Sequence, residues 1–178
     1  MKITRSICQY DYPAKLTSQG KPANESCCVL ACVQMQVESI TGETYLETDF
    51  YNKMLSNRFI REDGYINNYD DILRLILIER KEFQHQANVI AAIKQFSVRF
   101  GIYHKMQLPE RPADSGDFVP PIPVIGYLAN RQHAVLIVAA SQSETGEITL
   151  KVIDPKFRGE KARQVLPVSA VRKFGVFQ

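Results

Sequence analysis

The stretch that decides the fold of this chain is NESCCVLACVQM, which runs from Asn24 to Met35. Ser26 can cap a helix start, because its hydroxyl accepts a hydrogen bond from a backbone N–H that the helix leaves unpaired. Gly42 supplies a stop, and between the two signals apolar residues recur at the spacing of one helical face: Leu30, Val33, Val37 and Ile40. The pattern therefore predicts a helix with Cys27 and Cys28 in its first turn.

The position of these two cysteines favours reactive chemistry. Unpaired N–H groups and the positive end of the helix dipole favour a thiolate over a thiol at a helix start. A cysteine nucleophile is usually prepared in this way, and a histidine from elsewhere in the fold must then hold the thiolate as an ion pair. Cys32 lies one turn further along the same helix, where a buried and inert side chain is the more common role.

Length and composition are those of an ordinary globular protein. The chain has 178 residues, 45% of them hydrophobic and 23% charged, which suits one domain over residues 1–178. The net charge of +3 is too small to argue for binding of nucleic acid or of an anionic membrane. Three of the four cysteines fall on one short helix, where their spacing has the wrong geometry for ordinary disulfides, so reduced thiols are expected.

No segment has the features of a membrane anchor or of a cleaved leader. The start, MKITRSIC, lacks the apolar run of a secretory signal. No window approaches the apolar length needed to span a bilayer, so membrane insertion is not expected. The sequence thus predicts a cytoplasmic protein, or one exported without a cleavable Sec signal in the manner of an effector.

Helical patterns dominate the first part of the chain. A short strand is expected in residues 1–9 and a loop in residues 10–24, ahead of the cysteine helix. A second helix is expected over residues 43–55, and its side chains predicted to face the core are Tyr45, Leu46, Phe50 and Leu55. Two more amphipathic patterns predict helices over residues 69–80 and 87–99. The predicted helical part therefore covers residues of about 24–100.

Strand patterns follow, in the part of about 101–178. Three hydrophobic, β-rich runs cover residues 123–128, 134–139 and 148–153, and a hairpin-type connection at residues 143–146 joins the last two. A final segment, residues 164–177, is expected to add a strand or an edge. Helices first and consecutive strands afterwards predict an α+β fold, with the N-terminal helices packed on a C-terminal antiparallel sheet.

Three histidines, His85, His104 and His133, are the candidates for a base. His85 lies in a polar run, and His104 lies beside a lysine that disfavours its protonated form. His133 stands at the start of the most hydrophobic strand, and Asp154 ends the next strand. If the two strands are antiparallel neighbours, His133 and Asp154 lie at the same edge of the sheet. An imidazole–carboxylate contact is therefore expected there, and it would fix the tautomer and stabilise the imidazolium.

Three short motifs occur in a fixed order along the chain. The first is CVLACVQM at residues 28–35, the second is HAVLIV at residues 133–138, and the third is VIDP at residues 152–155. Together they resemble the nucleophile helix, the His-Ala-Val strand and the Asp-Pro strand end of papain-like bacterial cysteine peptidases, the C39-like and AvrRpt2-like groups. The order Cys, His, Asp and the helices-then-sheet layout agree with the same groups.

The resemblance implies a papain-like fold with a catalytic triad of Cys28, His133 and Asp154. Alignment on the Ala, Cys and Met positions of the first motif selects Cys28, with Cys27 as the other choice. The chain departs from the family by having two adjacent cysteines there, and by Val29-Leu30 in place of the commoner Gly-Pro or Trp-Ala.

The resemblance also implies an oxyanion-hole glutamine ahead of the nucleophile. Gln19 is the best candidate, although at nine residues before Cys28 it is farther away than in papain itself. Gln9 is a more remote candidate for the same role.

The function implied by the resemblance is hydrolysis of a peptide or isopeptide bond in a protein or peptide substrate, through a thioester and without a cofactor. Deamidation or acyl transfer would use the same residues, since only the second nucleophile changes. A catalytically inactive papain-like module that binds a peptide is the alternative from another class. A metal site built from the three clustered cysteines and a histidine lacks the usual C-x₂₋₄-C spacing and is not expected. The substrate sequence and the oligomeric state stay open.

Overall fold

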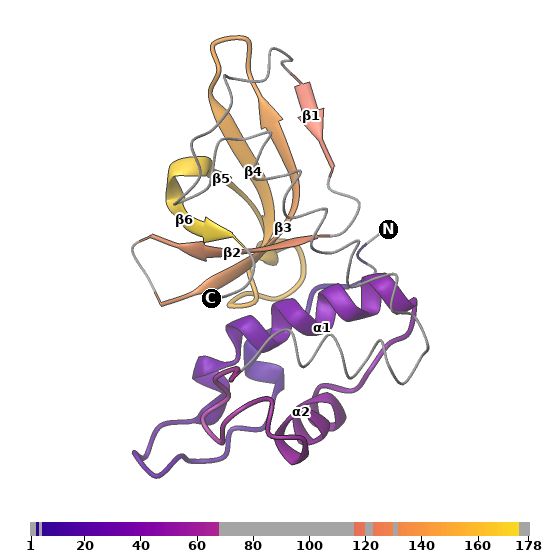
Figure 1. Ribbon diagram of the computed structural model, residues 1–178, viewed down its shortest axis with the longest axis vertical. Helices are drawn as coiled ribbons and strands as arrows, with labels where there is room; N and C mark the ends of the chain where they lie inside the picture. The colour runs from indigo at the N-terminus through magenta and orange to yellow at the C-terminus, as the bar shows by residue number, and fades with distance from the viewer. Residues whose placement is uncertain (1–2, 4, 68–115, 120–122, 130–131, 175–178) are drawn as a thin grey trace.

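The structure is a computed structural model that describes residue 3 and residues 5–67, 116–119, 123–129 and 132–174. Within these residues the predicted α+β class is confirmed, since two α-helices lie beside one antiparallel β-sheet (Figure 1). The predicted helices at 69–80 and 87–99, together with His85 and His104, lie outside the described residues. In the described part of the chain, neither helix is long and apolar enough to cross a lipid bilayer.

Helix α1, Cys28–Thr41, ends where the sequence predicts. Gly42 takes a left-handed conformation with φ of 72°, and its N–H donates to the carbonyl of Glu38. This backbone geometry suits glycine and closes the last helical turn. Leu30, Val33 and Val37 are all fully or almost fully buried, so the predicted apolar face is the face that packs into the core.

The start of α1 differs from the prediction, because the N-cap is Cys27 rather than Ser26. Ser26 belongs to a preceding 3₁₀ turn, η2, Ala23–Ser26. Cys27 follows with a φ of −83° and a ψ of 13°, so the backbone is not extended at the residue before the helix. A capping serine needs extended backbone to turn its hydroxyl toward the first N–H groups, and the 3₁₀ turn removes that geometry.

The sheet has the strand order β5-β4-β3-β2-β6, and β1, Gly116–Phe118, pairs with the far end of β3. The predicted runs form β2, Val124–Leu128, β3, Ala134–Gln142, and β4, Ile148–Ile153. The predicted hairpin turn is also present between β3 and β4, where the Ser143 N–H donates to the Glu147 carbonyl at 2.9 Å.

The predicted C-terminal strand is two strands on opposite edges of the sheet. β5, Arg163–Pro167, pairs with β4, whereas β6, Val171–Phe174, pairs with β2. A 3₁₀ turn, η4, Val168–Ala170, separates them. Because the two strands pair with different partners, the chain crosses the sheet and brings β6 beside β2 (Figure 1).

Strand β3 is buried on both faces, which explains its continuous hydrophobic sequence. Ala134 and Leu136 face the core that includes α1 and Tyr12. Val135 and Ile137 face a second apolar cluster on the opposite side of the sheet. The alternation follows from the period of two along a strand, and it fixes the position of β3 relative to α1.

Where the structure describes residues 1–9, they do not form the predicted strand. Residues 5–8 are irregular and lead into a 3₁₀ turn, η1, Gln9–Asp11. Ile7 is almost completely buried, and its N–H donates to the sulfur of Met35 in α1 at 3.4 Å. The apolar residues that suggested a strand therefore serve to cover α1, and the segment has no ladder partner among the described residues.

Helix α2, Glu47–Ser56, begins four residues later than the predicted start at residue 43. The preceding segment is held by polar contacts instead: the Tyr45 N–H donates to the Glu38 carboxylate, and Arg5 and Gln34 donate to the Tyr45 carbonyl. Phe50 is buried as predicted, but Leu46 is 66% exposed, so its predicted core position is wrong.

Candidate functional site

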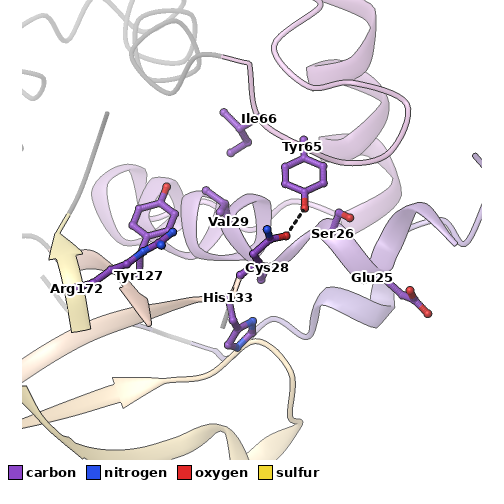
Figure 2. A pocket seen from close by; sticks show the side chains of 10 residues that line it. Glu25, Ser26, Cys28, Val29, Tyr65, Ile66, Tyr127, His133 and Arg172 are labelled. Atoms are coloured by element: carbon purple, nitrogen blue, oxygen red, sulfur yellow. Dashed lines mark hydrogen bonds between the residues drawn. The ribbon is translucent and has the colours of Figure 1, made fainter. Parts of the chain in front are cut away.

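Cys28 is the first residue of α1 and lies in a pocket of ≈ 340 Å³ together with His133. Helix and sheet both contribute to this pocket, because α1 supplies the cysteine and the segment before β3 supplies the histidine (Figure 2). The backbone N–H of Cys28 has no hydrogen-bond acceptor among the described residues. A free N–H at a helix start is a suitable donor for an anion that develops next to the sulfur.

The predicted imidazole–carboxylate contact is present. Nε2 of His133 lies 2.7 Å from Oδ1 of Asp154. His133 immediately precedes β3 and Asp154 immediately follows β4, and these strands are antiparallel neighbours as expected. With Nε2 engaged by Asp154, Nδ1 is the ring nitrogen left for Cys28, which lines the same pocket.

The carboxylate of Asp154 is fixed independently of the histidine. Oδ1 accepts a second hydrogen bond, from the N–H of Lys156 at 2.8 Å. The Asp154 N–H itself donates to the carbonyl of Ala162 at 2.7 Å, and the residue is 3% exposed. The acid therefore has a fixed position in the turn after β4 and can orient the imidazole.

The electrostatics of the pair favour a charged histidine. Burial lowers the pKa of His133, but hydrogen bonds to Asp154 and Cys28 and their negative charges outweigh burial and raise it to about 9. Burial raises the pKa of Asp154, and the hydrogen bonds from His133 and Lys156 outweigh it, so the pKa lies below its usual value. Near neutral pH the site therefore contains an imidazolium beside the Cys28 sulfur.

The geometry distinguishes Cys28 from the other two cysteines of the cluster. Cys27 is fully buried, its Sγ donates to the carbonyl of Ala23 at 3.5 Å, and burial is the main cause that raises its pKa to about 12. Cys32 is fully buried in the core, and burial raises its pKa as well. Both thiols are thus held in the neutral form, and neither lines the pocket.

Gln19 does not lie at the site. It is an exposed residue that lines a separate hollow with Arg61 and Asp63, so the structure does not bring it together with Cys28. The physical reason is that residues 17–21 form their own tight turn, closed by a hydrogen bond from the Thr17 N–H to the Lys21 carbonyl. The turn moves Gln19 away from the helix start.

Gln9, the more remote candidate, lies close to the loop that leads into α1. Its Nε2 donates to the carbonyl of Glu25 at 3.0 Å, and its backbone N–H donates to the carbonyl of Pro155 at 2.7 Å. The residue is 4% exposed, and its Oε1 has no partner among the described residues. Gln9 therefore links the strand end that carries Asp154 to the segment that precedes Cys28.

Four other residues that line the pocket were not predicted from the sequence. Tyr65 and Ile66 come from the turn after α2, Tyr127 comes from β2, and Arg172 comes from β6. Tyr65 donates from its hydroxyl to Oε1 of Gln132 at 3.5 Å, so it reaches across the pocket to the residue before His133 (Figure 2). The dipeptide Asp63-Gly64 is typical of a turn, but nothing local in the sequence indicates what that turn packs against.

Gly64 is the residue that allows this turn to approach α1. Its φ is 80°, and a Cβ built on it would lie 2.6 Å from Sγ of Cys27 and 2.8 Å from the carbonyl oxygen of Ala23. Only glycine combines the left-handed conformation with such a close approach. The contact holds Tyr65 and Ile66 against the helix start and so sets one wall of the pocket.

Comparison with known proteins gave no match: no family model, no curated protein and no solved structure is similar to this chain.

Proposed function

We propose that this chain is a papain-like cysteine hydrolase that cleaves a peptide or isopeptide bond with Cys28, His133 and Asp154. The observation that carries the proposal is the 2.7 Å contact between Nε2 of His133 and Oδ1 of Asp154, in a pocket that His133 shares with Cys28. The nucleophile at a helix start and the base at a strand start, with the helix packed on an antiparallel sheet, support the papain-like assignment.

The first half of the reaction forms a thioester. The Cys28 thiolate attacks the carbonyl carbon of the substrate amide, and the electron pair of the C=O bond moves to oxygen. The free N–H of Cys28 donates a hydrogen bond to this oxyanion. When the tetrahedral intermediate collapses, the C–N bond breaks and the His133 imidazolium gives its Nδ1 proton to the leaving amine.

The second half releases the acid. His133, now neutral, takes a proton from a water molecule as that water attacks the thioester carbonyl. Collapse of the second intermediate breaks the C–S bond, and the Cys28 thiolate and the His133 imidazolium are restored. Asp154 keeps Nε2 occupied in both halves, so that Nδ1 always faces the reacting atoms.

The same steps serve deamidation when the leaving amine is ammonia, and acyl transfer when an amine replaces water. A module that binds a peptide without turnover is the alternative of another class. The raised pKa of His133 and the fixed Asp154 favour the enzyme, because a binding role requires neither.

A thiol-directed activity probe tests the proposal. The wild-type chain is incubated with an epoxysuccinyl probe, and the labelled peptide is identified by mass spectrometry, with Cys28→Ala and Cys27→Ala as matched variants. The proposal is supported if Cys28 is labelled in wild type and in Cys27→Ala, and if no other cysteine is labelled in Cys28→Ala. Absence of labelling at Cys28, with peptide binding unchanged by Cys28→Ala, would favour the inactive binding module.

A further inference from the structure

The pocket continues beyond Cys28 toward the edge of the sheet, where it has an apolar floor and one cationic end. Val29, Ile66 and Tyr127 line this arm, and Arg172 lies at its far end on β6 (Figure 2). Val29, Ile66 and Tyr127 are partly buried, whereas Arg172 is exposed. The arm is thus an amphipathic path that leads from the nucleophile to a guanidinium.

The guanidinium of Arg172 has no ion-pair or hydrogen-bond partner among the described residues. Two other exposed arginines are paired with acids, Arg158 with Asp11 at 2.6 Å and Arg61 with Asp63. A planar guanidinium that extends toward a substrate pocket is suited to a carboxylate, which it can hold through two parallel hydrogen bonds.

The only acidic residue that lines the pocket within the described part of the chain is Glu25. It lies on the other side of Cys28 from Arg172, and its carboxylate is turned away from the pocket (Figure 2). Glu25 therefore does not neutralise Arg172, and the pocket has a positive charge at one end and a negative charge at the other. A negative group on the substrate is favoured at the Arg172 end and disfavoured at the Glu25 end.

We infer that the arm ending at Arg172 is a substrate subsite for a carboxylate, on an acidic side chain or at the chain terminus of the substrate peptide. This inference rests on the function proposed above and adds its substrate class. The apolar walls between Cys28 and Arg172 accommodate the methylenes of a glutamate stem, so glutamate is favoured over the shorter aspartate.

Epoxysuccinyl peptides test the subsite, because they react with a cysteine thiolate and carry peptide on both sides of the epoxide. One series varies each position among Glu, Gln and Lys, and a second compares a free C-terminal acid with its amide. The rate of Cys28 labelling is measured by mass spectrometry. At one position Glu should react about 3–10-fold faster than Gln, and the preference should disappear at about 1 M salt.

Variants of Arg172 separate a specific contact from a general charge effect. Arg172→Gln should bring the Glu-to-Gln rate ratio close to one, and Arg172→Glu should shift the preference toward Lys. Arg163→Gln, which removes an exposed arginine from β5 on the opposite edge of the sheet, is the matched control and should keep the ratio.

The outcomes separate the two proposals. A preference for glutamate in the first series identifies an acidic side chain as the source of the carboxylate, and a preference for the acid over the amide in the second identifies the chain terminus. Labelling at equal rates with all peptides, or a ratio unchanged in Arg172→Gln, overturns the subsite but leaves the hydrolase intact. Failure of every peptide to label Cys28 overturns the hydrolase, and the subsite with it.

Discussion

Nε2 of His133 lies 2.7 Å from Oδ1 of Asp154, although 21 residues separate them in the chain. The contact exists because β3 and β4 are antiparallel neighbours, so that the start of one and the end of the other meet at one edge. Asp154 is also held in position by a hydrogen bond from the Lys156 N–H. The relationship is what orients His133 toward Cys28 in the proposed hydrolase.

Removal of the orienting acid should give a graded loss of activity. Asp154→Ala is expected to lower kcat by about 10-fold to 10⁴-fold, with a milder effect on KM, because the acid neither attacks nor transfers the substrate proton. Asp154→Asn should do less damage, since it can still accept a hydrogen bond from the imidazole. Steady-state kinetics with a cleaved peptide checks this, and Asp11→Ala, an exposed aspartate paired with Arg158, is the control. Full activity in Asp154→Ala would reduce the triad to a dyad.

The charge on His133 should make stability depend on pH. Its folded pKa of about 9 lies above the ordinary 6.5, so the protonated form is the one that the fold stabilises. The contribution is complete below about pH 6.5 and is lost as the pH rises through 9. Because the imidazole meets solvent in the pocket, the expected loss is about 1–2 kcal/mol.

This pH dependence is measured by chemical denaturation of wild type and His133→Gln on both sides of the window. The difference in the free energy of unfolding should be larger at the acidic side and should shrink at the alkaline side. A difference that stays constant across the window would mean that His133 is neutral throughout. NMR titration of the imidazole gives the same pKa directly.

Gly64 should tolerate no side chain. Gly64→Ala is expected to lose about 1–2 kcal/mol from the left-handed conformation and a further 1–3 kcal/mol from overpacking against Cys27 and Ala23. Gly20→Ala is the matched control, because Gly20 has a similar φ of 72° but nothing within 4 Å of an added Cβ. Thermal or chemical unfolding of both variants measures the difference, and equal losses would mean that the turn does not pack on α1 as described.

The two glutamines should differ in their effect on turnover. Gln9→Ala removes the hydrogen bond to the Glu25 carbonyl ahead of Cys28. Because Cys28 is then held less firmly in position, kcat should fall by about 10-fold. Gln19→Ala alters an exposed turn outside the pocket and should leave kcat unchanged. Kinetics of the two single variants, with melting curves to separate activity from stability, makes the comparison. A large loss in Gln19→Ala alone would restore Gln19 to the site.

The parts of the fold that the sequence predicted are those set by local periodicity. The apolar spacing in residues 28–41 and Gly42 define α1, and the hydrophobic runs define β2, β3 and β4. The pairing of β3 with β4 follows from their short turn, and it was enough to bring His133 to Asp154. Local signals thus predicted the contact between the histidine and the acid.

The errors come from positions where distant contacts decide the structure. Leu46 is exposed because Arg5 and Glu38 hold the neighbouring Tyr45 in a segment that is not helical, and no local pattern reveals that network. The sequence places Gln19 nearer to Cys28 than Gln9, but a tight turn at residues 17–21 directs Gln19 away from the helix start. Arg172 reaches the pocket only because the chain crosses from one edge of the sheet to the other between β5 and β6.

The central claim is that His133 activates Cys28 as a nucleophile, and the rate of Cys28 alkylation by iodoacetamide tests it most directly. Peptide mass spectrometry gives the rate near neutral pH at each of the four cysteines, in wild type and in His133→Ala. We expect wild-type Cys28 to react faster than Cys8, Cys27 and Cys32, because the helix start and the neighbouring imidazolium favour its reaction, and His133→Ala should slow the reaction of Cys28. An unchanged Cys28 rate in His133→Ala, or slow and equal labelling of all four cysteines, would contradict the claim.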